Sequence, residues 1–517
     1  MQRDLSQFAD RTFDVVVVGG GIHGACVARD AALRGMSVAL LEQGDFCSAT
    51  SHNSLKTIHG GIRYLQHLNF KRAIESIREQ QILRRTMGHL VQPMRFMMPT
   101  YGWAMRGPLA MGAGIAMFEG LTLAMSLRDG NRVEAPKGRV MGAGACKRMA
   151  PGVDTDGLTG GSIWADAQVA YADKAVLQIL KDAVTHGAVV ANYVRAEKVE
   201  IADGAVTGVT VRDKTSDQVM TIAAKQVVNA TGPWADAWLA EAAPDARALA
   251  VALVRSMNLV IDKPAPDLAI AVKSTLESDS KIDSAKRMFF MVPWQGKTVI
   301  GTTHFSHKGS LDIAPSASEV GSFVDDFNAA YPTLDIQARD VLYAYVGLTP
   351  GDDSTDADGA KLHESKVVDH EGATGLVSII SIKWTTARLV AERVVDVLAK
   401  RHDGAGACQT RKRALPDDAS TPSEAAGLDN DGLRAFVEGH IAETQAQHLD
   451  DIVLRRTNDL VLGRLTARQL KTIVAVMAAH FGWSDATRNA EVRSALARLA
   501  PSAYRQGLVA AFAGVDL

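Results

Sequence analysis

A run of four valines followed by a glycine-rich turn places the strongest constraint on the fold of this chain. Val15 to Val18 are β-branched and apolar, which is typical of a strand buried inside a parallel sheet. Gly19, Gly21 and Gly24 follow in the spacing G-x-G-x-x-G. The first glycine allows a sharp turn, the second lets the backbone approach a phosphate, and the third lets a helix lie close on the strand. The sequence therefore predicts a strand, turn and helix in which the helix N-terminus faces a pyrophosphate.

An acidic residue at the end of the next apolar run indicates which dinucleotide is held. Glu42 ends the run Met-Ser-Val-Ala-Leu-Leu-Glu, 18 residues after Gly24. A carboxylate at this place accepts hydrogen bonds from both ribose hydroxyls and disfavours a 2′-phosphate. A tight turn needs glycines for structural reasons alone, so the prediction depends on strand, glycines, helix, second strand and acid occurring in that order. FAD or NAD is expected in preference to NADP.

The composition excludes several classes of function. At 517 residues the chain is too long for one core, and 47% hydrophobic with 22% charged residues is ordinary for a globular protein. A formal net charge of −2 gives no overall attraction for nucleic acid, so no nucleic-acid partner is expected. Four cysteines, far apart and without a C-x-x-C pair, favour reduced thiols. We expect no metal site, and the polar first ten residues, which lack a signal peptide, predict a cytoplasmic protein.

An apolar, glycine-rich stretch over residues 108–125 allows two interpretations. It is interrupted by Glu119 and falls short of the ~18 to 20 apolar residues of a membrane span. It forms either a buried helix or a surface that dips into a bilayer. We expect burial, because interfacial helices usually carry a more strongly charged opposite face.

The segments that favour cofactor binding are split along the chain. A buried strand at 226–229 ends in Ala-Thr-Gly, another turn that passes close to a ligand, and a strand and a helix follow at 375–400. We therefore expect an FAD-binding domain from residues 1–90, 160–240 and 350–402, and a substrate or cap domain from 91–159 and 241–349. Almost purely helical patterns predict a third domain over 415–517. This split organisation is typical of a flavoprotein and disfavours a simple NAD dehydrogenase.

The loop after the second strand carries the chemically reactive side chains. Residues 49–65 bring Lys56, His59, Arg63 and Tyr64 together with hydroxyls and two glycines. A loop that follows a dinucleotide-binding half lies where a flavin ring and a substrate meet. His59 is the natural base for a hydroxyl proton near neutral pH, and its structural alternative is to hold the loop by hydrogen bonds.

Motifs along nearly the whole chain resemble those of one family. They are Val-Gly-Gly-Gly-Ile-His-Gly at 18–24, Lys-Thr-Ile-His-Gly-Gly-Ile-Arg-Tyr-Leu at 56–65, Pro-Met-Arg-Phe at 93–96, Asn-Ala-Thr-Gly-Pro-Trp at 229–234, Ile-Gly-Thr-Thr at 300–303 and Lys-Trp-Thr-Thr-Ala-Arg at 383–388. In this order they are similar to the FAD-dependent glycerol-3-phosphate dehydrogenases, which are D-amino-acid-oxidase-type, glutathione-reductase-like flavoproteins. The resemblance implies an α/β fold with an FAD-binding Rossmann domain, an inserted antiparallel β-sheet substrate domain and a C-terminal helical domain.

The resemblance also implies the residues that hold FAD. They are Gly19, Gly21, Ile22, His23, Gly24, Glu42, Gln43, Thr50, Ser51, Ser54, Lys56, Thr57, His59, Gly60, Val194, Ala230, Thr231, Gly232, Trp234, Lys383, Trp384 and Thr385. His59, Arg63 and Lys383 match the positions beside the reacting carbon. There an alcohol gives hydride to flavin N5 while His59 takes the hydroxyl proton, Arg63 neutralises developing charge, and Lys383 holds the flavin electrostatically. The helix that follows turns its positive end to the flavin.

The chain departs from the family where the substrate phosphate is expected. The family's Gly-x-Arg-Pro segment is Gly-Leu-Thr-Pro here, with Leu348 and Thr349, and a second arginine is replaced by His363 or Glu364. A Gly-Gly pair before Lys383 is Ser-Ile. The loss of two charge-assisted contacts of ~1.5 to 3 kcal/mol each lowers the affinity for a phosphorylated substrate by orders of magnitude, unless other residues replace them.

Several substrate assignments therefore stay open. Replacement cations are available at Arg255, Arg287, Lys361 and Lys366, although each is better explained as an ordinary surface charge, because nothing in its spacing requires a ligand. The residues expected at the substrate are Arg63, Tyr64, Arg287, Thr349 and His363. We expect oxidation of sn-glycerol 3-phosphate or a related polyol phosphate. The alternatives are an alcohol or amine without phosphate, and a flavin-binding protein without catalysis.

The expected assembly is a homodimer, and the expected electron acceptor is a membrane quinone or oxygen. Peripheral attachment to the inner face of the membrane is the alternative to a purely cytoplasmic location.

Overall fold

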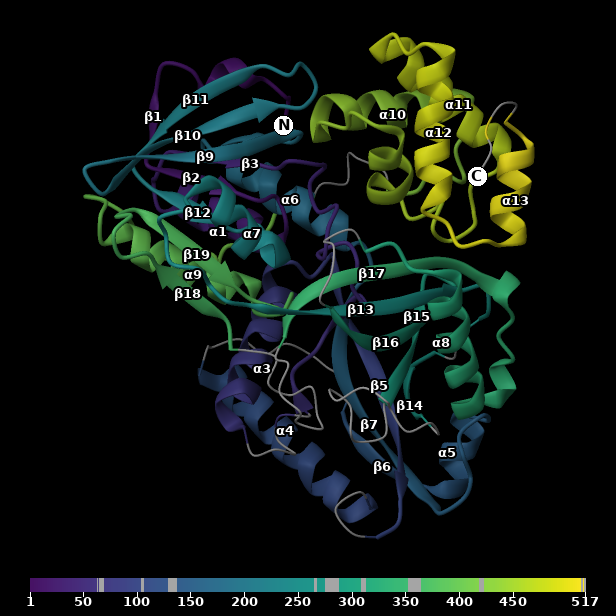
Figure 1. The fold of residues 1–517 in the computed structure, drawn as a ribbon. Helices are drawn as coiled ribbons and strands as arrows, with labels where there is room; N and C mark the ends of the chain where they lie inside the picture. Colours follow the sequence, from purple (N-terminus) through teal and green to yellow (C-terminus); the bar gives the residue numbers. More distant parts are fainter. Residues whose placement is uncertain are drawn as a thin grey trace.

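Three parts make up the molecule, as Figure 1 shows. The computed structural model describes the chain apart from residues 63, 65–68, 104–106, 129–136, 265–266, 275–287, 308–312, 352–363, 418–422, 513–514 and 516–517. A layered α/β part contains the glycine-rich turn, a large curved sheet carries helices on both faces, and the C-terminal helices form a separate bundle. The expected fold class is confirmed.

A six-stranded sheet, mostly parallel, forms the centre of the first part. Its strand order is β18 (Lys366–Asp369), β19 (Leu376–Ile380), β12 (Val227–Asn229), β2 (Val15–Val18), β3 (Val38–Leu41) and β8 (Val189–Ala191). One face is covered by α1 (Ile22–Leu33), α6 (Ala172–Thr185) and α9 (Ala387–Ala399). Both faces of β2 and β3 are buried, which explains their unbroken apolar sequences.

A smaller sheet covers the other face. It consists of β1 (Thr12–Phe13), β11 (Val219–Ala224), β10 (Ala205–Asp213) and β9 (Val194–Ala202), with α7 (Ala235–Ala242) beside β9. Val16, Val18 and Leu41 of the central sheet pack against this layer. Strands that lie far apart in the sequence thus share one core, as a discontinuous cofactor domain requires.

The second part is a nine-stranded sheet. Its main path is β17 (Val341–Gly351), β13 (Ala252–Ile261), β16 (Lys297–His307), β15 (Met288–Trp294), β14 (Ala269–Lys273), β5 (Val91–Tyr101), β7 (Leu158–Val169) and β4 (Thr57–Ile58), and β6 (Arg139–Gly142) pairs with β7. The helices α5 (Ala143–Met149) and α8 (Ala317–Ala330) pack into one core, and α3 (Phe70–Thr86) and α4 (Pro108–Arg128) into another. The boundary expected at residue 160 falls inside β7, which pairs with β5 over nearly its whole length, so this strand lies in the large sheet.

The third part is helical, as expected. It contains α10 (Asn430–Thr444), a short π-helix (Asp451–Arg456), α11 (Ala467–Phe481), α12 (Asp485–Ala497) and α13 (Ala503–Ala510). Its core includes Tyr343 and Tyr345 of β17, so the bundle packs directly on the large sheet.

The burial expected for the apolar stretch at 108–125 is wrong. Helix α4 extends over 21 residues and is buried only at Met111, Ile115, Phe118 and Ser126. Leu109 and Leu127 are 81% and 73% exposed. Among the residues described, α4 is the one helix long and apolar enough to cross a membrane by length and composition. A narrow stripe of α4 residues at helical spacing packs on α3 and the sheet. The described part of the chain leaves the other faces of α4 uncovered.

Close packing at the first turn requires the glycines there. A Cβ on Gly24 would lie 1.9 Å from the Gly19 carbonyl oxygen, and Gly19 itself has φ of +112°. Only glycine allows α1 to start this close to the end of β2.

We predict that Gly24→Ala lowers the stability of the protein by about 1–3 kcal/mol, because α1 must move away from β2. The measurement is the thermal unfolding midpoint. Gly120→Ala is the matched control, since a Cβ there meets nothing within 4 Å on exposed α4. Equal midpoints for the two variants would contradict the close-packing argument.

Candidate functional site

A cavity of about 1450 Å³ lies where the three parts meet. Its wall includes the turn after β2, the loop at 48–59, the short turn Gly232–Trp234 and residues 381–385. Strands β13, β16 and β17 contribute side chains from the large sheet, and the C-terminal bundle contributes others. The segments that sequence reasoning assigned to cofactor and substrate therefore surround one space.

Most predicted cofactor residues line this cavity. They are Gly19, Gly21, Ile22, His23, Glu42, Gln43, Thr50, Ser51, Ser54, Thr57, His59, Val194, Ala230, Thr231, Gly232, Trp234, Lys383, Trp384 and Thr385. Tyr64 and Thr349, both predicted at the substrate, line it too. Gly24, Lys56 and Gly60 do not form part of the wall. Arg63, Arg287 and His363 lie outside the described residues, as does Lys361.

Lys56 lies behind the loop. Its ammonium donates to the His52 carbonyl at 2.6 Å and lies 4.2 Å from the centre of the Tyr345 ring. Burial lowers the pKa of this lysine. Direct contact between Lys56 and a cofactor was expected. The lysine is instead buried against aromatic rings, and its hydrogen bond to His52 holds the shape of the loop.

Backbone N–H groups and hydroxyls converge at one end of the cavity. The Glu42 carboxylate accepts from Gly20 N at 2.7 Å and Gly44 N at 2.8 Å, and burial raises its pKa. The Ser51 hydroxyl accepts from Ile22 N, at the start of α1, at 3.0 Å. A helix N-terminus with nearby hydroxyls is suited to bind a pyrophosphate.

His59, Tyr64 and Lys383 are brought together at another part of the cavity wall. The rings of His59 and Tyr64 lie edge to face with centres 6.1 Å apart, and the Lys383 ammonium lies 4.1 Å from the centre of the Tyr64 ring. The guanidinium carbon of Arg72, on α3, lies 5.7 Å from the centre of the same ring. Burial, and then the charge of Arg72, lower the pKa of Lys383 to about 8.

Asp166 of β7 holds the loop beside His59. Its buried carboxylate accepts from Gly60 N, from the Gln80 amide and from the Trp164 indole N–H. Burial raises the pKa of Asp166 to about 6. Sequence reasoning missed this residue, and the only signal was one acid inside the mostly apolar segment 163–169 of β7.

The large sheet presents polar side chains to the cavity. Ser256 Oγ lies 2.8 Å from His304 Nδ1, and Thr302 donates to Asn258 Oδ1 at 2.8 Å. Leu348 is fully buried and also lines the wall. Two of the replacement cations are placed elsewhere: Arg255 alternates with Ser256 on β13 and is paired with Glu319, and Lys366 is exposed on β18.

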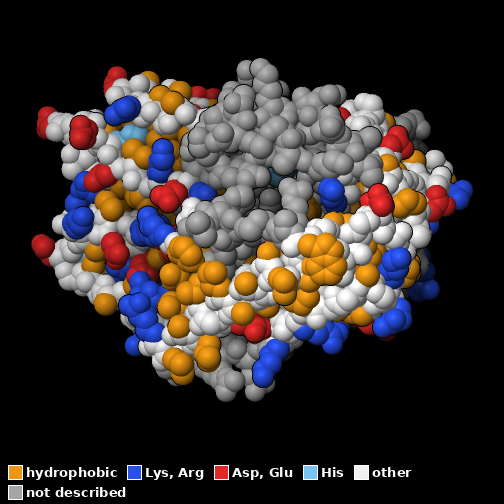
Figure 2. All heavy atoms as spheres, turned by 90° about the horizontal axis from the view of Figure 1, so that it is seen from below, with side chains coloured by type: hydrophobic (Ala, Val, Ile, Leu, Met, Phe, Trp, Pro, Cys, Tyr) orange, Lys and Arg blue, Asp and Glu red, His pale blue; other side chains and the backbone are white. Residues whose placement is uncertain are grey.

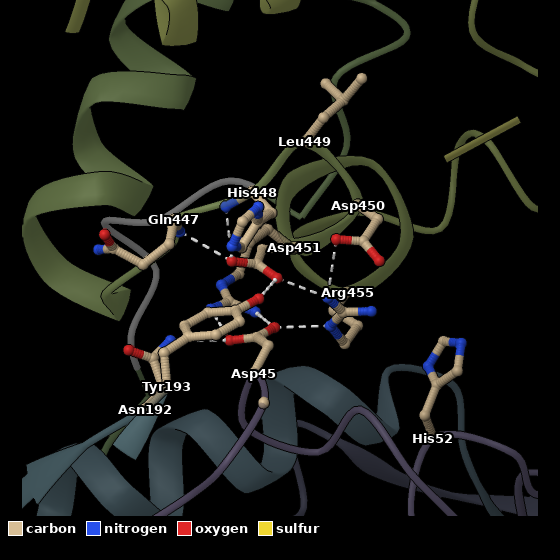
Figure 3. A network of polar contacts seen from close by, with 12 residues as sticks. Asp45, His52, Asn192, Tyr193, Gln447, His448, Leu449, Asp450, Asp451 and Arg455 are labelled. Carbon is tan, nitrogen blue, oxygen red and sulfur yellow. Dashed lines mark hydrogen bonds and ion pairs between the residues drawn. The ribbon is translucent and has the colours of Figure 1, made fainter. Parts of the chain in front are cut away.

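A buried ionic network fastens the C-terminal bundle to the loop after Glu42 (Figure 3). Asp45 accepts from Arg455 at 2.6 Å and from Arg456 at 2.7 and 2.8 Å. Although burial opposes it, the charges of Arg456 and Arg455 hold the pKa of Asp45 below its usual value. Tyr193, which precedes the cavity residue Val194, donates to Asp451 at 2.6 Å. The bundle thus fixes two loops that border the cavity.

We predict that Arg456→Leu destabilises the protein by about 3–5 kcal/mol, because it leaves the buried Asp45 carboxylate short of two hydrogen bonds. Thermal unfolding measures the loss. Arg434→Leu is the control, since Arg434 forms an exposed pair with Glu438 worth about 0–1 kcal/mol. The importance assigned to the network is wrong if both variants unfold at the same temperature.

Comparisons with known proteins agree with this geometry. Residues 14–397 match the family model described as FAD dependent oxidoreductase. The chain is 31% identical over 474 residues to a glycerol-3-phosphate dehydrogenase of Synechocystis, covering 89% of this chain and 82% of that protein. It is 29% identical over 458 residues to an aerobic glycerol-3-phosphate dehydrogenase of Staphylococcus saprophyticus, covering 88% and 78%. Among solved structures, the glycerol-3-phosphate dehydrogenase of Bacillus halodurans complexed with FAD superposes with a TM-score of 0.73, 23% identity and coverage of 96% and 97%.

Proposed function

Because the chain belongs to the FAD-dependent oxidoreductases and, within them, to the glycerol-3-phosphate dehydrogenase family, we propose that it oxidises the secondary alcohol of sn-glycerol 3-phosphate, or of a related polyol phosphate, to the ketone. The observation that carries the proposal is one cavity whose wall contains both a dinucleotide-binding turn and a cluster of reactive side chains. A pyrophosphate-type turn and Glu42 lie at one end, and His59, Tyr64 and Lys383 line another part of the wall.

FAD is the cofactor, and the residues present fit it. Glycine at position 19 lets two cofactor-binding turns pack together in the cavity wall, since a Cβ on Gly19 would lie 2.5 Å from the Ala230 oxygen. The indole N–H of Trp384, in the cavity wall, is buried without a hydrogen-bond partner among the described residues, so it is available to a bound group. Bound FAD supplies the acceptor for a hydride from the alcohol carbon.

The side chains around Tyr64 supply the acid–base and electrostatic parts of the reaction. His59 takes the hydroxyl proton as the alcohol carbon loses its hydride. Lys383 and Arg72 place positive charge beside the same ring, where an alkoxide or an anionic substrate group is stabilised. Asp166 fixes the backbone at Gly60 and so keeps His59 in place.

We predict that His59→Gln lowers the turnover of sn-glycerol 3-phosphate with an artificial electron acceptor by about 10²–10⁴-fold, because the general base is lost. Bound FAD, measured by its absorbance, is expected to stay unchanged. His480→Gln, on an exposed part of α11, is the control and should keep full activity. Normal turnover in the His59 variant would exclude it as the base.

A substrate without phosphate is the second candidate, and Thr349 is the observation that favours it. This uncharged residue lines the cavity and occupies the place of the arginine in the family's Gly-x-Arg-Pro segment. Turnover of glycerol or an amine in preference to glycerol 3-phosphate would support this candidate. A protein that binds FAD but is reduced by none of these substrates would support the third alternative, a binding protein without catalysis.

The exposed face of α4 supports attachment of a cytoplasmic protein to the inner face of a membrane. Figure 2 shows hydrophobic side chains gathered on this side of the molecule with Lys and Arg around them. Leu109, Met117, Leu123 and Leu127 are exposed along α4, and Arg128, Lys137 and Arg139 are exposed near its end and on the adjoining strand. An apolar face bordered by cations suits an anionic lipid surface. A membrane quinone as electron acceptor and a homodimer complete the proposal.

We predict that the protein sediments with vesicles containing anionic lipid, and that Leu123→Gln/Leu127→Gln abolishes most of this binding because the buried apolar area is lost. Val219→Gln, an exposed apolar position on β11, is the control. If the α4 variant still bound the vesicles, this surface would be excluded as the attachment site.

A further inference from the structure

We infer that Arg72, with Lys383 as its partner, binds the phosphate of the substrate from the α3 side of the cavity. This assignment rests on the proposed function, because it supplies the anion-binding group that the family places at the positions of Thr349 and of residue 363 or 364. Nothing in the sequence motifs marks Arg72, which lies outside the loop that resembles the family.

Position is the first argument for Arg72. It lies in the first turn of α3, whose N-cap Asn69 accepts from Arg72 N at 3.2 Å. Its guanidinium carbon is 5.7 Å and the Lys383 ammonium 4.1 Å from the centre of the Tyr64 ring. All of these side chains line the same cavity, and the ring of His59 lies against Tyr64. An anionic group here is adjacent to the proposed base, as a three-carbon polyol phosphate requires.

Charge balance is the second argument. Two cations share one aromatic ring, and each disfavours the charge of the other. Glu75, which pairs with Arg393 at 2.5 Å, and Glu364, which lies 3.9 Å from Lys71, each attract the Lys383 ammonium less strongly than Arg72 repels it. No carboxylate among the described residues forms an ion pair with Lys383. A phosphate dianion between Arg72 and Lys383 would relieve the repulsion, and the N-terminus of α3 adds to the attraction.

The part of the cavity wall that the large sheet forms provides the third argument. Leu348 and Thr349 of β17 carry no charge there, and Arg255 on the neighbouring strand is paired with Glu319 of α8. The polar groups there, Ser256 with His304 and Asn258 with Thr302, are suited to hydroxyls. The phosphate is therefore expected at α3 and the hydroxyl end at the large sheet.

Arg72→Gln tests this assignment, with Lys71→Gln as the matched control on the same helix turn. Lys71 has a 72% exposed side chain and does not line the cavity. We expect Arg72→Gln to raise KM for sn-glycerol 3-phosphate by about 10- to 100-fold with little change in kcat, since the contact holds substrate and transition state alike. The Lys71 variant should differ from the parent protein by less than about twofold, as expected for an exposed charge, and Arg72→Lys should recover part of the loss.

Binding of inorganic phosphate, followed through tryptophan fluorescence of the FAD-loaded protein, separates this inference from the proposed function. Phosphate that binds the parent protein and not the Arg72→Gln variant supports the site even if glycerol 3-phosphate is not oxidised. Unchanged KM and unchanged phosphate affinity in Arg72→Gln overturn the inference while the proposed function stands. If Arg72→Gln does not fold, the ratio of KM values for Arg72→Lys and Lys71→Gln decides, and equal values overturn the assignment.

Discussion

The arrangement of the molecule depends on the buried hydrogen bonds that the Asp45 carboxylate accepts. This carboxylate is fully buried and receives hydrogen bonds from Arg455, Arg456 and the Asn192 amide. These groups come from the C-terminal bundle and from the turn between β8 and β9, while Asp45 itself follows Glu42. One charge thus ties three distant segments of the chain. A buried carboxylate tolerates no loss of its partners, so the segments are fixed relative to one another.

The cavity is a consequence of this arrangement. Its nucleotide end is built from the turn after β2 and from Glu42, and its reactive side from a loop that the large sheet supports through Asp166. The side chains proposed for chemistry, His59 and Lys383, come from segments more than 300 residues apart in the sequence. Their meeting at Tyr64 places a base and a positive charge in one wall, which is what hydride removal from an alcohol needs.

Local sequence patterns predicted the local structure, but they did not predict the contacts between distant segments. The glycine spacing and the valine run predicted β2 and α1 because both depend on residues within one turn. The chain passes from β8 in one sheet to β9 in the other at Tyr193, which adopts φ of +55°, and the apolar sequence at 188–194 contains no signal for this change. Composition predicted an apolar α4 and not which of its faces would be covered. Asp166 and Arg72 acquire their places only from tertiary neighbours.

Reduction of the bound FAD by sn-glycerol 3-phosphate is the most direct measurement of the central claim, the transfer of hydride from the substrate's secondary carbon. The FAD-loaded protein is mixed without oxygen with substrate carrying hydrogen or deuterium at that carbon, and the loss of the oxidised flavin absorbance is followed. We expect rapid bleaching that deuterium slows. Flavin that stays oxidised with glycerol 3-phosphate, while glycerol or an amine reduces it, would contradict the claim.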